Sequence, residues 1–199
     1  MKPSRRILRF IMVALLLCGQ PARAEGLTGE IQWVSVPSED KREQQSLSEI
    51  SIYLEYEVAD PVAIFFVGYH DQEFRSATLG LAQKMGDWQL GLGMGRAEFD
   101  DMNHLVINPW AYYADDEYTG YLHYESYRNG RAHSDFMKGY ALRHFGAFSL
   151  GAHAEMDFGL GPRVEVMLSE GVRLWGVVPV AHKPTEGAMK AMIGLTAGF

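Results

Sequence analysis

Apolar and polar residues alternate along most of this chain after its first two dozen positions. From Phe148 to Phe158 every second side chain is apolar, and these side chains share one face. The residues between them form the opposite face, which carries His153, Glu155 and Asp157. A repeat of two residues is the period of a β-strand, whereas a helix would scatter these charges around its circumference. The pattern therefore predicts an all-β protein.

Turn-forming residues divide the alternating part into about twelve segments. Tight connections alternate with longer or more polar ones, which is typical of an up-and-down antiparallel transmembrane β-barrel. In two segments the apolar and polar side chains do not separate onto opposite faces. The segment 62–69 is apolar on both faces, and 135–144 carries charges on both. We expect twelve strands, with ten as the alternative count. The expected strands are 28–36, 48–58, 62–70, 74–84, 88–98, 104–113, 118–128, 134–144, 147–158, 163–169, 172–182 and 187–199.

The first 24 residues have the pattern of a cleavable export signal. Basic residues from Lys2 to Arg9 precede an apolar run from Phe10 to Leu17, and Ala22-Arg23-Ala24 offers a cleavage site. The apolar run is shorter than the roughly 20 residues that a membrane-spanning helix needs. We therefore expect residues 1–24 to be a signal peptide and residues 25–199 to form a single barrel domain.

Removal of that leader leaves a strongly acidic protein. The leader carries five of the 18 Lys and Arg residues and no acidic ones, so 13 basic residues remain against 25 acidic ones, a net charge of −12. Such a protein gains nothing electrostatically from a phosphate backbone, which argues against nucleic acid as a partner. The single cysteine, Cys18, lies within the leader, so disulfides cannot stabilise the fold.

Strand length and aromatic placement favour a membrane barrel over a soluble secreted ligand-binding β-barrel, which remains the alternative. Many segments have the roughly 9–11 residues that a tilted strand needs to cross a bilayer. Outer-membrane barrels also carry aromatic girdles at their interfaces. Aromatic residues at the expected short-turn ends are Trp88, Tyr112, Tyr113, Tyr118, Phe148 and Phe199.

The segment from Met189 to Phe199 resembles the C-terminal strand of Gram-negative outer-membrane β-barrel proteins. It alternates and stops on an aromatic residue, although Ala197 is smaller than the residue common at that position in the class. The resemblance implies an outer-membrane location, and it makes Phe199 the assembly signal that the barrel-assembly machinery recognises. The resemblance identifies this class of proteins but no specific family within it. The expected partners are outer-membrane lipids, that machinery during biogenesis, and ions or small solutes.

If the apolar face meets lipid, the polar face lines the lumen. Acidic and basic groups are both present there, so the lining forms either an internal salt-bridge network or the wall of a narrow channel. A dozen strands fall between a filled barrel of about 8 strands and an open one of about 16. The solute is not specified by the sequence. The lumen-lining candidates are Tyr53, Glu55, Glu57, His123, Glu125, His153, Glu155, Asp157, Arg163, Glu165, Arg173 and Lys190.

An outer-membrane lipid-modifying hydrolase is a second hypothesis, which the sequence supports less well. His133, Ser134 and Asp135 adjoin, but successive residues of a strand point to opposite faces. Ser149 and His153 share a face but lie about 13 Å apart along a strand. We therefore predict no catalytic residue.

Neither a metal nor another cofactor is expected. His153 and Glu155 lie two residues apart on one segment, and His123 and Glu125 repeat the spacing on another. Side chains so placed are about 7 Å apart, so one strand rarely chelates a metal alone. A surface protein that acts through its charged loop 37–47 is a further alternative, and so is a purely structural barrel.

Overall fold

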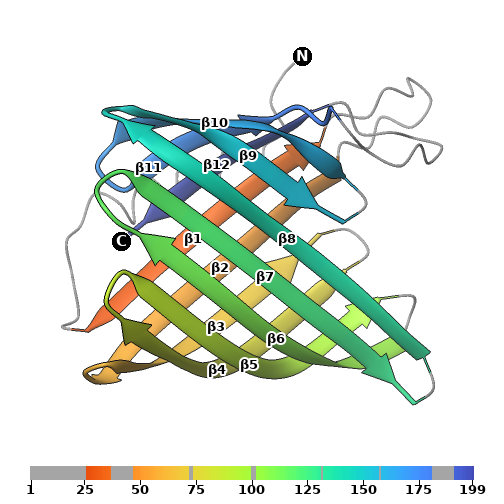
Figure 1. The fold of residues 1–199 in the computed structure, drawn as a ribbon. Coiled ribbons are helices and arrows are strands. Elements are labelled where there is room, and N and C mark those ends of the chain that lie inside the picture. Colours follow the sequence, from red (N-terminus) through yellow and green to blue (C-terminus); the bar gives the residue numbers. More distant parts are fainter. Residues whose placement is uncertain are drawn as a thin grey trace.

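The computed structural model describes residues 26–36, 47–71, 74–99, 102–130, 132–156, 158–180 and 191–199. These residues form a closed barrel of twelve antiparallel strands, in which neighbours in sequence pair and β1 closes on β12 (Figure 1). The predicted all-β, up-and-down barrel of twelve strands is confirmed. The strands are β1 Leu27–Val36, β2 Leu47–Ala59, β3 Val62–His70, β4 Arg75–Met85, β5 Trp88–Phe99, β6 Met102–Ala114, β7 Tyr118–Asn129, β8 Ala132–Phe145, β9 Phe148–Glu155, β10 Gly159–Ser169, β11 Val172–Val177 and β12 Met192–Gly198.

The first eight strands begin and end within two residues of their predicted bounds. The ninth ends at Glu155, and the segment 159–162, predicted as a loop because of Pro162, instead begins β10. Proline is tolerated here because its carbonyl, and therefore also its nitrogen, faces Val178, which lies past the end of β11, so the missing N–H removes no bond from the ladder. The Pro162 carbonyl still accepts a hydrogen bond from the Val178 amide at 3.4 Å. The eleventh strand was predicted to run to 182 but ends at Val177, so residues 178–180 are not strand, and β12 begins at Met192. The rest of the two predicted strands, 181–190, lies outside the described residues.

The five connections predicted to be tight lie at one end of the barrel, on the left in Figure 1, together with Phe199. At the other end, the β5–β6 and β7–β8 connections were predicted to be longer but are equally short, because Phe99 pairs with Met102 and Asn129 pairs with Ala132. Gly86, Gly146 and Gly171 occupy three of the five predicted tight turns, with φ values of 62°, 70° and 75°. Such left-handed backbone is accessible to glycine at little cost and gives the twist that two-residue hairpins need. The pattern of short connections read from the sequence thus corresponds to one rim of the barrel.

The turn between β6 and β7 is organised by Asp115. Its Oδ1 accepts backbone hydrogen bonds from Glu117 at 2.8 Å and Tyr118 at 2.6 Å, and the Tyr113 hydroxyl donates to its Oδ2. These bonds favour the charged carboxylate, the Tyr113 hydroxyl most strongly, and they lower the pKa of Asp115 below its usual value. The side chain therefore replaces missing ladder partners at this rim.

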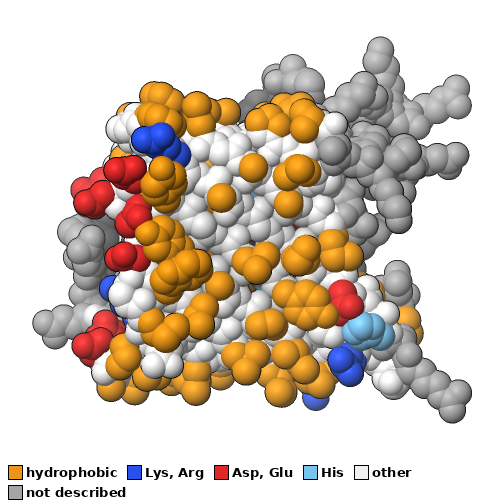
Figure 2. Space-filling model, in the orientation of Figure 1, with side chains coloured by type: hydrophobic (Ala, Val, Ile, Leu, Met, Phe, Trp, Pro, Cys, Tyr) orange, Lys and Arg blue, Asp and Glu red, His pale blue; other side chains and the backbone are white. Residues whose placement is uncertain are grey.

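The outer wall of the barrel is apolar. Thirty-three large hydrophobic side chains are exposed among the described residues, and on most strands they occupy every second position. Figure 2 shows them spread across the wall, while charged side chains gather toward its two ends. Soluble monomers rarely expose contiguous apolar patches beyond a few hundred Å². In the described residues, no helix is long and apolar enough to cross a membrane.

The inner face is far more aromatic than the sequence pattern suggested. One interior cluster joins Phe65 and Trp110, whose ring centroids lie 5.4 Å apart, to several tyrosines. This explains why 62–69 is apolar on both faces, because Phe65 packs inside while its neighbour Phe66 is exposed outside. Tyr112, predicted at the membrane interface, instead lines the interior, since it lies next to outward-facing Tyr113 on β6.

Glycines on the inner face make room for these rings. Gly91 lies opposite Trp110 in the β5–β6 register, and a β-carbon there would fall 2.1 Å from the indole. Gly194 on β12 likewise lies opposite Trp175 on β11, and a β-carbon at Gly194 would fall 2.2 Å from that indole. Each tryptophan therefore lies across a neighbouring strand that lacks a side chain at the point of contact.

The barrel closes where β1 meets β12. The amide of Gly29 donates to the Phe199 carbonyl at 3.0 Å, and the Phe199 amide donates back to the Gly29 carbonyl at 2.9 Å. The Phe199 ring covers Gly29, where a β-carbon would lie 2.5 Å from the ring. Phe199 therefore fixes the seam at the tight-turn rim.

Candidate functional site

The structure places the described lumen-lining candidates on the inward-facing positions of their strands. Most of them are buried or half-buried, and Glu57 is exposed where β2 reaches the tight-turn rim. Asp157 and Lys190 lie outside the described residues. The inward-facing candidates are Tyr53, Glu55, Glu57, His123, Glu125, His153, Glu155, Arg163, Glu165 and Arg173.

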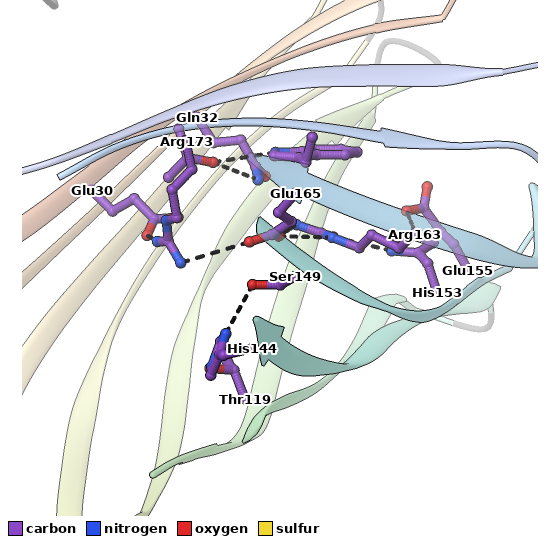
Figure 3. Close-up of polar contacts among 12 residues, drawn as sticks. Glu30, Gln32, Thr119, His144, Ser149, His153, Glu155, Arg163, Glu165 and Arg173 are labelled. Atoms are coloured by element: carbon purple, nitrogen blue, oxygen red, sulfur yellow. Dashed lines mark hydrogen bonds and ion pairs between the residues drawn. The ribbon is translucent and has the colours of Figure 1, made fainter. Parts of the chain in front are cut away.

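One wall of the lumen carries an ion-pair chain across β10, β11 and β1 (Figure 3). Arg163 donates to Glu165 Oε1 from Nε at 2.9 Å and from Nη2 at 2.5 Å. Arg173 donates to Glu30 at 2.8 Å and lies 4.0 Å from the other oxygen of Glu165. Buried charges need partners of this kind, because desolvation would otherwise exceed their attraction. This chain of ion pairs fixes both arginine side chains against the wall of the lumen.

Arg163 is held by aromatic rings as well. Its guanidinium lies 4.1 Å from the centroid of Tyr140 and 4.3 Å from that of Trp175, and Nη1 donates to His153 Nδ1 at 3.3 Å. The other nitrogen of His153 lies 3.1 Å from Glu155. Planar stacking and forked hydrogen bonds are the properties that distinguish arginine from lysine at such a site.

On β2, Glu55 is satisfied by neutral donors alone. Gln89 donates to both of its carboxylate oxygens, at 2.9 Å and 2.8 Å, and the Tyr53 hydroxyl donates to Oε2. No cation of the described chain lies within 4.0 Å of this carboxylate. Its negative charge is therefore solvated by hydrogen bonds and not neutralised.

A second hydrogen-bond network surrounds His123 on β7. The hydroxyls of Tyr69 and Tyr121 lie 3.2 Å and 2.9 Å from its Nδ1, and Glu125 lies 3.3 Å from its Nε2. Asn108 donates to Glu125 at 3.2 Å. These side chains come from β3, β6 and β7, so the network spans the wall opposite the ion-pair chain.

Between these two walls lies a cavity of about 230 Å³. Side chains from both walls line it, and the lining mixes charged, amide and aromatic groups. A single water needs only about 10–15 Å³ of such space, so the lumen holds several waters or a small solute. Two buried polar atoms of this lining have no hydrogen-bond partner among the described residues, namely Asn108 Oδ1 and Trp110 Nε1.

Several cavity-lining residues were not among the sequence candidates. Lys138 was missed because 135–144 carries charges on both faces, so the inward face of this strand could not be assigned. Tyr140, two residues away, lies on the same inward face as Lys138. Gln89 and Asn108 were missed because uncharged amides stand out little from a strand pattern. Glu30 lies on β1, whose inward face was not assigned, and Glu49 precedes the part of β2 whose inward face was assigned through Tyr53, Glu55 and Glu57. The alternation on β1 and β2 could have identified these two glutamates.

His144 provides the interior serine–histidine contact. Its Nδ1 lies 2.8 Å from Ser149 Oγ, and its Nε2 lies 2.8 Å from Thr119 Oγ1 (Figure 3). Both ring nitrogens are therefore occupied by hydroxyls. No carboxylate of the described residues lies within 4.0 Å of this ring, so the acid that orients the base in a catalytic triad is missing from this trio.

On the outer wall, His133 contacts Ser126 and Asp135, and not its sequence neighbour Ser134. Ser126 Oγ lies 3.2 Å and Asp135 Oδ1 lies 3.1 Å from the same nitrogen, Nε2. A relay needs the serine and the carboxylate on opposite nitrogens of the ring. The trio therefore lacks the geometry of a nucleophilic site. The described residues also contain no group of three or more side chains arranged to hold a metal ion.

No family model and no curated protein matches the chain. A solved bacterial polysaccharide outer membrane secretin aligns over 87% of this chain and 98% of its own, at 9% identity and a TM-score of 0.47. The NanC porin aligns over 86% and 97%, at 8% identity and a TM-score of 0.47. A mutant Rh. blastica porin aligns over 87% and 99%, at 11% identity and a TM-score of 0.37. With scores below 0.5, these similarities say nothing about the function of this chain.

Proposed function

We propose that this protein is an outer-membrane barrel whose lumen is a narrow channel for small hydrophilic solutes. The observation that carries the proposal is the pairing of an apolar outer wall with an interior cavity of about 230 Å³ that charged and amide side chains line together with aromatic ones. A soluble ligand-binding barrel would have the reverse arrangement, with apolar side chains inside and polar ones in water. The apolar wall fits hydrocarbon, because each exposed apolar side chain is stabilised by leaving water.

Conductance through a planar bilayer tests the channel. Ser51 lines the cavity on β2, whereas the adjacent Ile52 is exposed on the outer wall. We expect wild-type protein to give small, steady current steps in potassium chloride. Ser51→Trp should at least halve the step because the indole fills the cavity, and Ile52→Trp should leave it unchanged. A correctly folded protein that passes no current would contradict the channel proposal.

Membrane fractionation tests the location. If the leader is cleaved and the barrel inserts, the protein should fractionate with the outer membrane and migrate differently on gels before and after heating. Closed membrane barrels resist detergent unfolding without heat because every strand is paired. Recovery in the soluble periplasmic fraction without detergent would favour the soluble barrel.

We further propose that Phe199 is the assembly signal as well as part of the seam. Phe199→Asp should reduce the heat-modifiable barrel in membranes severalfold, because the Gly29 seam loses its cover and the assembly machinery loses the terminal ring. The matched control is Phe148→Asp, which removes an equally exposed ring from the same rim. Equal yields of the two variants would show that Phe199 has no special part in assembly.

A further inference from the structure

Two of the three cations that line the cavity, Lys138 and Arg163, lie on aromatic faces. The Lys138 ammonium lies 4.8 Å from the centroid of Tyr69 and 6.0 Å from that of Phe136. The Arg163 guanidinium lies between Tyr140 and Trp175, as described above. An aromatic face within about 6 Å attracts a cation through its quadrupole, most strongly when water is scarce. The lining of the cavity is therefore suited to holding positive charge.

Carboxylates outnumber cations inside the lumen. Between the two rims, the described inward-facing residues include six glutamates and three cations, a net charge of −3. Arg163 and Arg173 are paired with carboxylates, but Lys138 has none within 4.0 Å among the described residues. The glutamates are Glu30, Glu49, Glu55, Glu125, Glu155 and Glu165.

The approach to the lumen has the same sign. The tight-turn rim carries seven exposed acidic side chains, and the basic residues near them are Lys84 and Arg143. A mouth lined by one sign of charge raises the local concentration of the opposite ion. The acidic residues of this rim are Glu57, Asp60, Asp87, Asp115, Asp116, Glu117 and Glu170.

A buried acceptor in the cavity lining has no donor. Asn108 is fully buried, and its amide nitrogen donates to Glu125, which leaves Oδ1 as the free atom. Because Glu125 needs a donor, the orientation of the amide is fixed. An ammonium group has only donors, so it can satisfy this oxygen.

We propose that this cavity binds the ammonium group of a small organic cation, and that Lys138 is a tethered competitor for the same lining. The proposal rests on the channel function, because solute reaches the cavity through the lumen. Aromatic faces, Glu49 and the Asn108 oxygen hold the ligand, while the Lys138 ammonium reduces its affinity. The channel then prefers amines to carboxylates of equal size.

The test uses mature protein in planar bilayers with three probes of matched length: butylammonium, butyrate and butanol. Butylammonium should block the potassium current in a saturable manner, whereas butyrate and butanol should not block at the same concentration. Fluorescence of the folded protein in detergent gives a second measurement, because Trp110 and Trp175 line the cavity. Butylammonium should change this fluorescence over the same concentration range as the block.

Two variants should shift the half-blocking concentration in opposite directions. Glu49→Gln should raise it, and Lys138→Met should lower it, each by about tenfold, the effect of one unit charge several ångströms away in a partly hydrated site. Glu57→Gln makes the same charge change at the exposed rim and should shift it by no more than about twofold. If Lys138→Met does not fold, Lys138→Cys can be assembled and then given an ammonium by 2-aminoethyl methanethiosulfonate, which should weaken the block again.

The outcomes separate this proposal from the channel itself. Current without block by butylammonium, or a butyrate block that Lys138→Met removes, would overturn the ammonium site and leave the channel standing. Fluorescence binding of butylammonium by a folded protein that passes no current would support the site and overturn the channel. Neither current nor binding in a folded barrel would overturn both.

Discussion

Ile52→Arg should reduce the folded barrel in membranes at least tenfold, whereas Ser51→Arg, one residue earlier on β2, should assemble at close to the normal level. Both positions lie near the middle of β2, with Ile52 on the outer wall and Ser51 in the cavity lining. An arginine on the lipid face near mid-membrane costs roughly 2–4 kcal/mol. An arginine at position 51 instead enters a cavity that Glu49 also lines.

The amount of heat-modifiable protein measures assembly, and urea titration of the refolded barrel in lipid vesicles measures the free energy of unfolding. Cysteine labelling gives a check without added charge, because the only cysteine of the chain is Cys18 in the expected leader. Single cysteines at exposed positions 150, 152 and 154 of β9 should react with lipid-soluble reagents. Those at 153 and 155 should react with small water-soluble ones. Equal tolerance of arginine at 51 and 52 would mean that the outer wall does not meet hydrocarbon.

Strand positions could be predicted from the sequence because they depend on local chemistry. Alternation reports one buried and one exposed face, and turn residues mark where each strand ends. The predictions were wrong where the arrangement of the strands in the barrel overrode a local sequence rule. Pro162 looked like a loop residue, yet its nitrogen faces the side where β11 has already ended, which lets it enter β10. Tyr112 looked like an interface residue, yet the parity of β6 turns it inward.

The contents of the lumen could be predicted only in part. Alternation placed charged residues such as Arg173 and Glu55 on the polar face, but it could not name their partners. The Arg173–Glu30 pair joins β11 to β1 and depends on barrel closure, and Gln89 reaches Glu55 across strands that do not pair. The inward aromatic rings other than Tyr53 were missed because a strand pattern assigns apolar side chains to the lipid face by default.

Gly151 illustrates the same limit, because alternation places it on the polar face of β9 but does not report how closely the neighbouring strand approaches it. A β-carbon there would lie 1.8 Å from the Ala141 carbonyl oxygen, so β8 and β9 approach too closely for any side chain. We therefore expect Gly151→Ala to lower the free energy of unfolding by about 3 kcal/mol, the upper part of the usual range for overpacking. The clash involves backbone, which cannot move aside as a flexible side chain can.

Gly120→Ala on β7 is the matched control for this prediction. Its β-carbon would meet Tyr113 at 3.8 Å, an ordinary van der Waals distance, so the extra methyl should leave stability within about 1 kcal/mol of wild type or raise it by limiting the unfolded backbone. Urea titration of both variants in lipid vesicles measures the difference. Equal stabilities would mean that β8 and β9 separate without cost at Ala141, and that close strand approach does not require glycine at position 151.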